Sequence, residues 1–320
     1  MRNLQMNHRW KTAALALLVV APGSLMSCRA AARGEAFSSP EVAGEALVAA
    51  LKTSDEVALT RILGEGSEDL LTSGDPVLDQ AQRSEFVSAY ETQHAWEARE
   101  DGVTVLETGA DSWPFPIPLL DGEDGWRFDT AMGVEEILNR RIGGNELNTI
   151  QACLAFVDAQ REYYERNPRG HEGPEYARFI LSTEGERDGL YWPTSGDQAP
   201  SPLGPSYASA RAEGYSPTQG ERSPFHGYLF RVLHAQGPDA YGGAKDYVQG
   251  GALTGGFALV AWPARYGSSG VMTFLVNHVG LVYEKDLGPD TEAQVGAMQA
   301  FDPGAGWAVV SAEARTLSGG

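Results

Sequence analysis

Apolar residues in the N-terminal part of the chain recur at the three- and four-residue steps that are typical of amphipathic helices. The first such run follows Ser38-Ser39-Pro40-Glu41. A serine cap, a proline in the first turn and an early acid together predict a helix start there. We expect this helix to bury one face, which is formed by Val42, Ala46, Ala49 and Ala50.

Two further helices are predicted after this one. The first begins behind Asp55, whose side chain is suited to an N-cap, and the second extends from Gln82 to Trp96. The apolar positions of the first are Val57, Leu59, Ile62 and Leu63. The side chains of the second that are expected to face inward are Phe86, Tyr90 and Trp96.

Three strand-like segments follow these helices, at residues 103–109, 113–120 and 125–131. The turn LDGEDGW joins the last two segments, which predicts a hairpin. Prolines occupy every second position from 114 to 118, and proline cannot donate to a strand ladder. The middle segment is therefore expected to be an edge strand or an extended wall.

Helices followed by a meander of aromatic strands resemble the cystatin-like or NTF2-like α+β layout. In such folds the helices pack in the curve of the sheet, and a conical pocket sometimes remains. Four aromatic residues of the strands either line such a pocket or fill the core between helix and sheet. They are Trp113, Phe115, Trp126 and Phe128.

A long amphipathic helix is predicted behind Gly143-Gly144, with Asn145 as its cap. Its length of about twenty residues corresponds to roughly 30 Å, and Pro168 and Gly170 end it. Such a helix needs a partner surface, and the strands near the C-terminus are the expected one. The apolar stripe consists of Leu147, Ile150, Leu154, Val157 and Tyr164.

Those strands come after an irregular insertion at about residues 185–223, which is rich in proline, glycine and serine. The insertion is either a packed surface loop or a binding loop. Apolar residues then alternate with other residues, which predicts an antiparallel sheet with one covered face. The alternating residues are Tyr228, Phe230 and Val232 and then Met272, Phe274 and Val276.

The length of 320 residues exceeds one ordinary core, so two domains are expected. We predict an α+β class throughout. The N-terminal α+β domain spans residues 40–133, and the C-terminal domain spans 134–320 and contains the long helix packed on the antiparallel sheet.

The first residues carry three basic side chains and no acidic one, and an apolar run from about Ala13 to Ala21 follows them. This layout is typical of a secretory signal. The apolar run is too short to span a bilayer, which needs about 20 apolar residues. Leu25-Met26-Ser27-Cys28 resembles the lipobox of bacterial lipoproteins. That resemblance implies a signal peptide at 1–27, lipidation of Cys28 and a tether at 28–39. The alternative is ordinary cleavage after Ala30-Ala31-Ala32, which releases a secreted protein.

The lipoprotein interpretation places the chain in the bacterial cell envelope, held on a membrane by its lipid. Arg29 follows the cysteine, and no aspartate stands there to retain the protein in an inner membrane, so the outer membrane facing the periplasm is expected. The net charge of −19 argues against nucleic acid as a partner. The second cysteine, Cys153, is expected to be a buried small hydrophobic residue.

The sequence offers little evidence of catalysis, because GxSxG, HExxH and P-loop motifs are absent from it. The GSSG stretch at 267–270 is expected to be a turn, and His226, His234 and His278 are expected to be solvated or hydrogen-bonded. No cofactor is implied. Three acids lie near one turn, and they form a calcium site, an acid–base site or simply a solvated turn; the sequence leaves these alternatives open. These acids are Glu284, Asp286 and Asp290.

Residues 145–288 resemble the globular part of type IV pilins and pseudopilins. The features that carry this likeness are Asn145-Glu146, Ala159-Gln160, the GYLF segment at 227–230 and the AWP segment at 261–263. This implies a pilin-like sheet. The helix is polar on one face and follows another domain, which argues against filament formation.

Nearly the whole chain is similar to the bacterial envelope family catalogued as domain of unknown function 2950. The stretches WRFDTAMGVEEILNRRIGGNEL and GGFALVAWPARYGSSGVMTF are among those that carry this resemblance. It implies an envelope setting and no established activity.

Two functional hypotheses follow. The first is a non-catalytic envelope lipoprotein that binds a protein or a cell-wall partner. The second is a small-ligand-binding protein or enzyme that uses the aromatic pocket, with Asp111 or Asp129 at its mouth. A buried carboxylate of raised pKa in a cavity would favour the second hypothesis.

Overall fold

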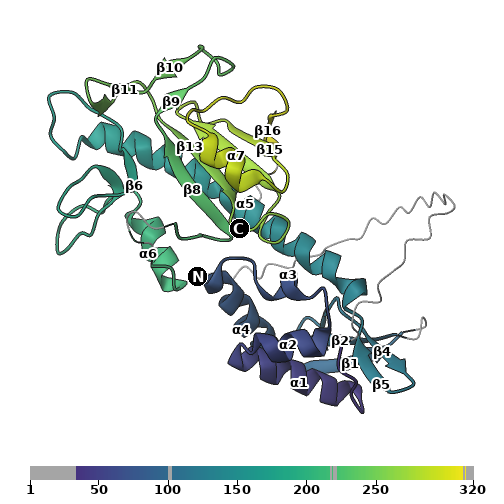
Figure 1. Ribbon diagram of the computed structural model, residues 1–320. Helices are drawn as coiled ribbons and strands as arrows, with labels where there is room; N and C mark the ends of the chain where they lie inside the picture. The colour runs from purple at the N-terminus through teal and green to yellow at the C-terminus, as the bar shows by residue number, and fades with distance from the viewer. Residues whose placement is uncertain (1–33, 100–102, 217, 219–221, 313, 315–320) are drawn as a thin grey trace. The chain divides into compact units, whose positions relative to one another are not determined.

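The computed structural model describes residues 34–99, 103–216, 218, 222–312 and 314. The expected signal peptide, Cys28 and the tether up to residue 33 lie outside the described residues. The described chain has the predicted α+β class, and Figure 1 shows the order of its parts. Helices come first, a sheet and a long helix follow, and a second sheet lies towards the C-terminus.

Four helices open the described chain, and the two predicted caps are confirmed. Ser39 Oγ accepts a hydrogen bond of 3.3 Å from the amide of Val42, and Asp55 Oδ1 accepts one of 3.0 Å from the amide of Ala58. The helices are α1 (Pro40–Thr53), α2 (Glu56–Leu63), α3 (Glu68–Leu71) and α4 (Pro76–Thr92).

The predicted apolar faces of the first two helices were partly wrong. In α1, Leu47 and Val48 are buried with Ala50, whereas Val42 is 43% exposed. In α2, Leu59, Ile62 and Leu63 are buried as predicted, but Val57 is 82% exposed. Helix α1 is rich in small residues and α2 has only 8 residues, so spacing alone does not determine which side packs inward.

The third predicted helix has different bounds in the structure. It is α4, which begins at Pro76 behind Asp75, a start signal of the same kind as Ser39-Pro40. Tyr90 is buried and Phe86 is half-buried, as predicted. The helix ends at Thr92, because the chain continues as strand β1 (His94–Ala98), and Trp96 belongs to that strand.

The N-terminal sheet is antiparallel, with the order β1-β2-β4-β5 and with β3 paired to β2. The predicted hairpin is confirmed by the pairing of Gly122 with Gly125 between β4 and β5. Only two short parts of the proline-containing segment pair in ladders, as expected for an edge piece. The further strands are β2 (Val103–Thr108), β3 (Trp113–Pro114), β4 (Leu119–Gly122) and β5 (Gly125–Phe128).

The long helix is much longer than predicted. Helix α5 spans Thr130–Arg166 and runs without a break through Gly143-Gly144. The predicted cap at Asn145 was therefore wrong, because Asn145 lies inside the helix, where its side-chain amide donates to the carbonyl of Ser269 at 2.9 Å. A Cβ at either glycine would meet nothing within 4 Å, so these residues are exposed positions in a regular helix and do not interrupt it. The predicted end is confirmed, since Asn167 caps the helix in a left-handed conformation.

The predicted domain boundary between residues 133 and 134 falls in the first turns of α5. The division into two domains stays a prediction. The predicted apolar stripe is confirmed at Ile150 and Val157, which are buried. The other predicted stripe residues, Leu147, Leu154 and Tyr164, are half-buried, and the buried residues of the helix also include Cys153, Phe156 and Tyr163.

The C-terminal sheet is antiparallel, with the order β16-β15-β14-β13-β8, as the alternation predicted. Its strands are β8 (Tyr228–Leu233), β13 (Ala258–Pro263), β14 (Met272–Asn277), β15 (Val282–Asp286) and β16 (Ala308–Val309).

The prediction that this sheet has one covered face was wrong, because every residue of β13 is buried. Helix α5 packs on one face, where Tyr228 Oη lies 3.5 Å from Glu146 Oε1. Helix α7 (Thr291–Ala297) packs on the other face, where Arg231 donates to the carbonyl of Val295 at 2.6 Å. Figure 1 shows α7 in front of the sheet and α5 behind it.

The predicted irregular insertion contains regular structure. It includes strand β7 (Gly189–Tyr191), which pairs in parallel with the preceding strand β6 (Phe179–Leu181), and helix α6 (Gly204–Ala212). Two small hairpins stand between β8 and β13. They consist of β9 (Ala235–Gln236) with β10 (Lys245–Asp246) and β11 (Val248–Gln249) with β12 (Ala252–Leu253).

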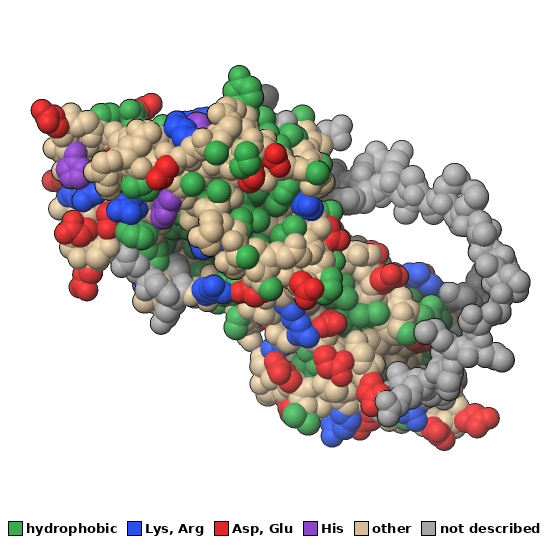
Figure 2. Space-filling view, turned by 45° about the horizontal axis from the view of Figure 1, so that its top comes forward, with side chains coloured by type: hydrophobic (Ala, Val, Ile, Leu, Met, Phe, Trp, Pro, Cys, Tyr) green, Lys and Arg blue, Asp and Glu red, His purple; other side chains and the backbone are tan. Residues whose placement is uncertain are grey.

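Among the helices of the described residues, none has the length and apolar character that a membrane span requires. Acidic side chains are distributed over the visible face of the molecule, as the net charge implies (Figure 2).

Candidate functional site

Of the four aromatic residues considered for a pocket, Phe115, Trp126 and Phe128 pack in the N-terminal core, and the ring of Trp113 lies 6.4 Å from that of Phe115. Phe115 lies 5.1 Å from Phe86 and 6.3 Å from Phe128, measured between ring centroids, and Phe128 is buried. Trp126 is half-buried on the same core. Trp113 is 40% exposed, and the guanidinium of Arg140 stands 5.4 Å above its ring. These contacts favour core filling, the other interpretation that the sequence left open.

The two acids considered for the mouth of that pocket occupy different settings. Asp129 is the N-cap residue of α5 but accepts no capping hydrogen bond through its side chain, and Asp111 is exposed.

A buried carboxylate that the sequence did not single out is Asp75. Its Oδ1 accepts the amide hydrogens of Val77 and Leu78 and so caps α4. Its Oδ2 accepts a hydrogen bond of 2.9 Å from Tyr215 Oη and one of 2.8 Å from the amide of Gly227. One fully buried side chain thus joins the start of α4 to the segment before β8.

The GSSG stretch forms the predicted turn, closed by a 2.9 Å hydrogen bond from the amide of Gly267 to the carbonyl of Gly270. Ser268 donates to the carbonyl of Asp69 at 3.0 Å, next to the buried guanidinium of Arg141. The turn therefore has a structural role between α3 and α5.

Two of the three late histidines have polar partners, as expected, whereas the buried Nδ1 of His278 has no hydrogen-bond partner within the described residues. His226 Nε2 lies 3.1 Å from Glu213, and His234 Nε2 lies 3.2 Å from the carbonyl of Arg178. His278 is packed edge-on against Tyr247, and burial, with the nearby charge of Lys245, lowers its pKa.

Within the described ranges, no group of three or more histidine, cysteine, aspartate or glutamate side chains is arranged to hold a metal ion. A metal site at Glu284, Asp286 and Asp290, one of the alternatives that the sequence left open, therefore finds no support in the described residues. Asp286 accepts hydrogen bonds from Tyr266 Oη at 3.1 Å and from the amide of Gly288 at 2.7 Å, as in a closed turn.

Glu284 is nevertheless electrostatically perturbed. Burial raises its pKa, and the negative charge of Glu146 on α5 adds to this effect. Glu146 itself is held by the amides of Val271 and Met272 at 3.0 and 2.9 Å. Ionisation of Glu284 thus places a second negative charge near a fixed one.

A pH-dependent stabilisation by Glu284→Gln follows from this. Because the folded-state pKa is raised, the contribution of Glu284 to stability is present below the ordinary pKa and is lost as the pH rises through the raised value. The variant should therefore unfold at a higher urea concentration than the parent at pH 7, and the difference should shrink towards pH 4. The exposed control Glu172→Gln should show no such trend.

Cys153 is 0% exposed, and burial raises the pKa of its thiol to about 12. The prediction that Cys153 is a buried small hydrophobic residue is confirmed. In a Cys28→Ala variant it is the remaining cysteine of the chain. We expect this thiol to react with a disulfide reagent at pH 8 only after denaturant is added, because the thiolate is the nucleophile. Rapid labelling of the native protein would contradict the described burial.

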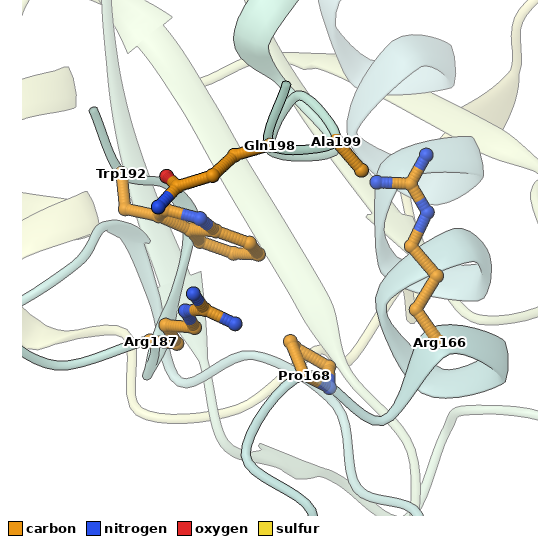
Figure 3. Close-up of a pocket in the computed structure, with 6 residues that line it drawn as sticks. All are labelled: Arg166, Pro168, Arg187, Trp192, Gln198 and Ala199. Atoms are coloured by element: carbon orange, nitrogen blue, oxygen red, sulfur yellow. The ribbon is translucent and has the colours of Figure 1, made fainter. Parts of the chain in front are cut away.

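A pocket of about 280 Å³ lies between the end of α5 and the segments around β7 (Figure 3). Tyr163 on α5 donates its hydroxyl to the carbonyl of Arg187, and its ring meets Trp192 edge-on at 6.3 Å. The pocket is lined by Arg166, Pro168, Arg187, Trp192, Gln198 and Ala199.

Sequence reasoning identified the insertion as a surface or binding loop but did not select these residues. The available signal was an arginine and a tryptophan in a segment rich in proline and glycine. Their convergence with Arg166 depends on where the loop returns to α5, which local spacing does not reveal.

The described fold defines a mixed α+β protein in which one long helix follows the first sheet and packs on the second. The chain belongs to the family described as Protein of unknown function (DUF2950), whose model matches residues 34–310. No curated protein and no solved structure matches the chain. The resemblances to cystatin-like, NTF2-like and pilin-like folds stay predictions.

Proposed function

We propose that this protein is a non-catalytic lipoprotein of the bacterial cell envelope that binds a protein or a cell-wall partner. The observation that carries the proposal is the position of Cys28, directly behind Leu25-Met26-Ser27 at the end of a short apolar run. A thiol at this one position suffices for attachment of a lipid. Each buried CH₂ of the acyl chains contributes about 0.8 kcal/mol to membrane binding.

The charge of the chain supports attachment through a lipid over attachment through its surface. A protein with a net charge of −19 is repelled by anionic headgroups, so its surface charge does not hold it on such a membrane. The outer membrane facing the periplasm is the proposed location. The hydrophobic core clusters of the described residues give the exposed faces a stable framework for recognition.

The anchor is tested by fractionating cells that express Cys28→Ala. We expect this variant to leave the membrane fraction, whereas the matched variant Cys153→Ala stays in it. An unchanged distribution of Cys28→Ala would refute the lipid anchor.

The recognition role is tested by cross-linking the intact anchored protein in envelope membranes and identifying the products. A protein or cell-wall fragment recovered reproducibly supports the proposal. Recovery of none, together with turnover of a small molecule by the purified chain, would replace it with the enzymatic alternative.

A further inference from the structure

We propose that the pocket at the end of α5 binds a small organic carboxylate. This inference is independent of the lipid anchor, since it depends only on described residues of the C-terminal part. A failure of the Cys28 experiment would leave it untouched.

Positive charge is concentrated at this pocket, although the chain is strongly acidic. The sequence holds 24 basic and 43 acidic residues, yet two arginines line this one pocket. Figure 3 shows the guanidinium groups of Arg166 and Arg187 on two sides of the same space. Charge of this sign, gathered in a concave site, favours an anionic ligand.

Arg187 is held in place, but its charge is not neutralised. Its backbone carbonyl accepts a hydrogen bond from the hydroxyl of Tyr163, and its guanidinium stands 5.7 Å from the centre of the Trp192 ring. Within the described residues it forms no ion pair. The N–H groups of its guanidinium are thus available to a ligand. A carboxylate can accept two parallel hydrogen bonds from them.

Arg166 has a different role. It is paired with Glu162 and donates to the carbonyl of Pro200 at 2.6 Å, so it ties the loop to α5 and forms the opposite wall. Its charge is partly offset, which leaves Arg187 as the principal contact.

The remaining lining of the pocket indicates what the rest of the ligand should be. Trp192 and Pro168 give the pocket an apolar side, and the amide of Gln198 adds a polar group. The volume of about 280 Å³ is near the lower end of small-molecule sites, which span roughly 300–1,000 Å³. A carboxylate that carries a compact apolar or sugar face fits this lining, and both an acidic sugar and the C-terminus of a peptide have that chemistry.

The test is calorimetric titration of the full-length chain in detergent with glucuronate and with N-acetyl-dialanine. Glucose and the C-terminal amide of N-acetyl-dialanine are the matched neutral probes. We expect at least one carboxylate to bind with a Kd of about 1 mM or below and its neutral counterpart to bind at least tenfold more weakly. Binding of glucuronate would indicate an acidic sugar as the ligand, and binding of N-acetyl-dialanine would indicate the C-terminus of a peptide.

Variants assign the binding to this pocket. Arg187→Gln should weaken carboxylate binding at least tenfold, Arg187→Lys less, and the remote control Arg61→Gln should leave it unchanged. The side chain of Arg187 is exposed, so the fold should tolerate both changes, and circular dichroism checks this. Absence of carboxylate binding, or binding that Arg187→Gln leaves intact, would overturn the inference.

Discussion

Replacement of Asp75 by alanine should lower the free energy of unfolding by about 3–5 kcal/mol, the largest effect expected of a single side chain here. Asp75 is 0% exposed, and four donors converge on its two carboxylate oxygens. Each buried donor left without a partner costs about 1–3 kcal/mol. Urea unfolding followed by circular dichroism measures the change.

The structure supplies a matched control for this variant. Asp55 also caps a helix, but it is exposed and accepts one amide hydrogen, so Asp55→Ala should cost only about 1 kcal/mol. Tyr215→Phe removes one of the four donors to Asp75, and its cost should lie between the two. Burial, with the negative charge of Asp75, raises the pKa of Tyr215, so its hydroxyl remains a donor at neutral pH. Equal effects of Asp75→Ala and Asp55→Ala would contradict the described network.

Two glycines of α5 should respond in opposite directions to alanine. At Gly133 a Cβ would lie 2.4 Å from the carbonyl oxygen of Pro116 and 2.7 Å from a side-chain carbon of Ile117. The backbone at residue 116 cannot yield cheaply, so Gly133→Ala should destabilise the protein by about 1–3 kcal/mol.

At Gly143, in the same helix, a Cβ would meet nothing within 4 Å. Gly143→Ala should therefore stabilise the protein by about 0.5–1 kcal/mol, because alanine loses less backbone freedom than glycine in a helix. Thermal unfolding of both variants checks the pair. Destabilisation by Gly143→Ala would show that the helix is broken there, as the sequence pattern had predicted.

Two helix caps were predictable from sequence because each is encoded within a few residues, whereas the third predicted cap, Asn145, lies inside α5. Ser39 and Asp55 both cap as expected. The unbroken course of α5 through Gly143-Gly144 was not predictable in the same way. Packing of α5 on β14 offsets the low helix propensity of two exposed glycines, and that contact joins residues far apart in sequence.

The packing of α7 on the second face of the C-terminal sheet could not be predicted from the sequence for a related reason. Alternation in Tyr228, Phe230 and Val232 identifies one apolar face, but it does not reveal that α7 returns to cover the other. The same limit applies to the candidate site. The hydroxyl of Tyr163 is hydrogen-bonded to the carbonyl of Arg187 across the loop, and no local sequence pattern predicts this hydrogen bond. Cys153, whose burial follows from its place on a helix stripe, was predicted correctly.

The central claim is that Cys28 carries the lipid that holds this acidic protein in the envelope. The most direct measurement is the mass of the N-terminal peptide of the chain isolated from membranes. We predict a peptide that begins at Cys28 and carries a diacylglycerol thioether and an acylated amino group. A peptide that retains Met1, or one that begins after Ala32 without lipid, would contradict the claim.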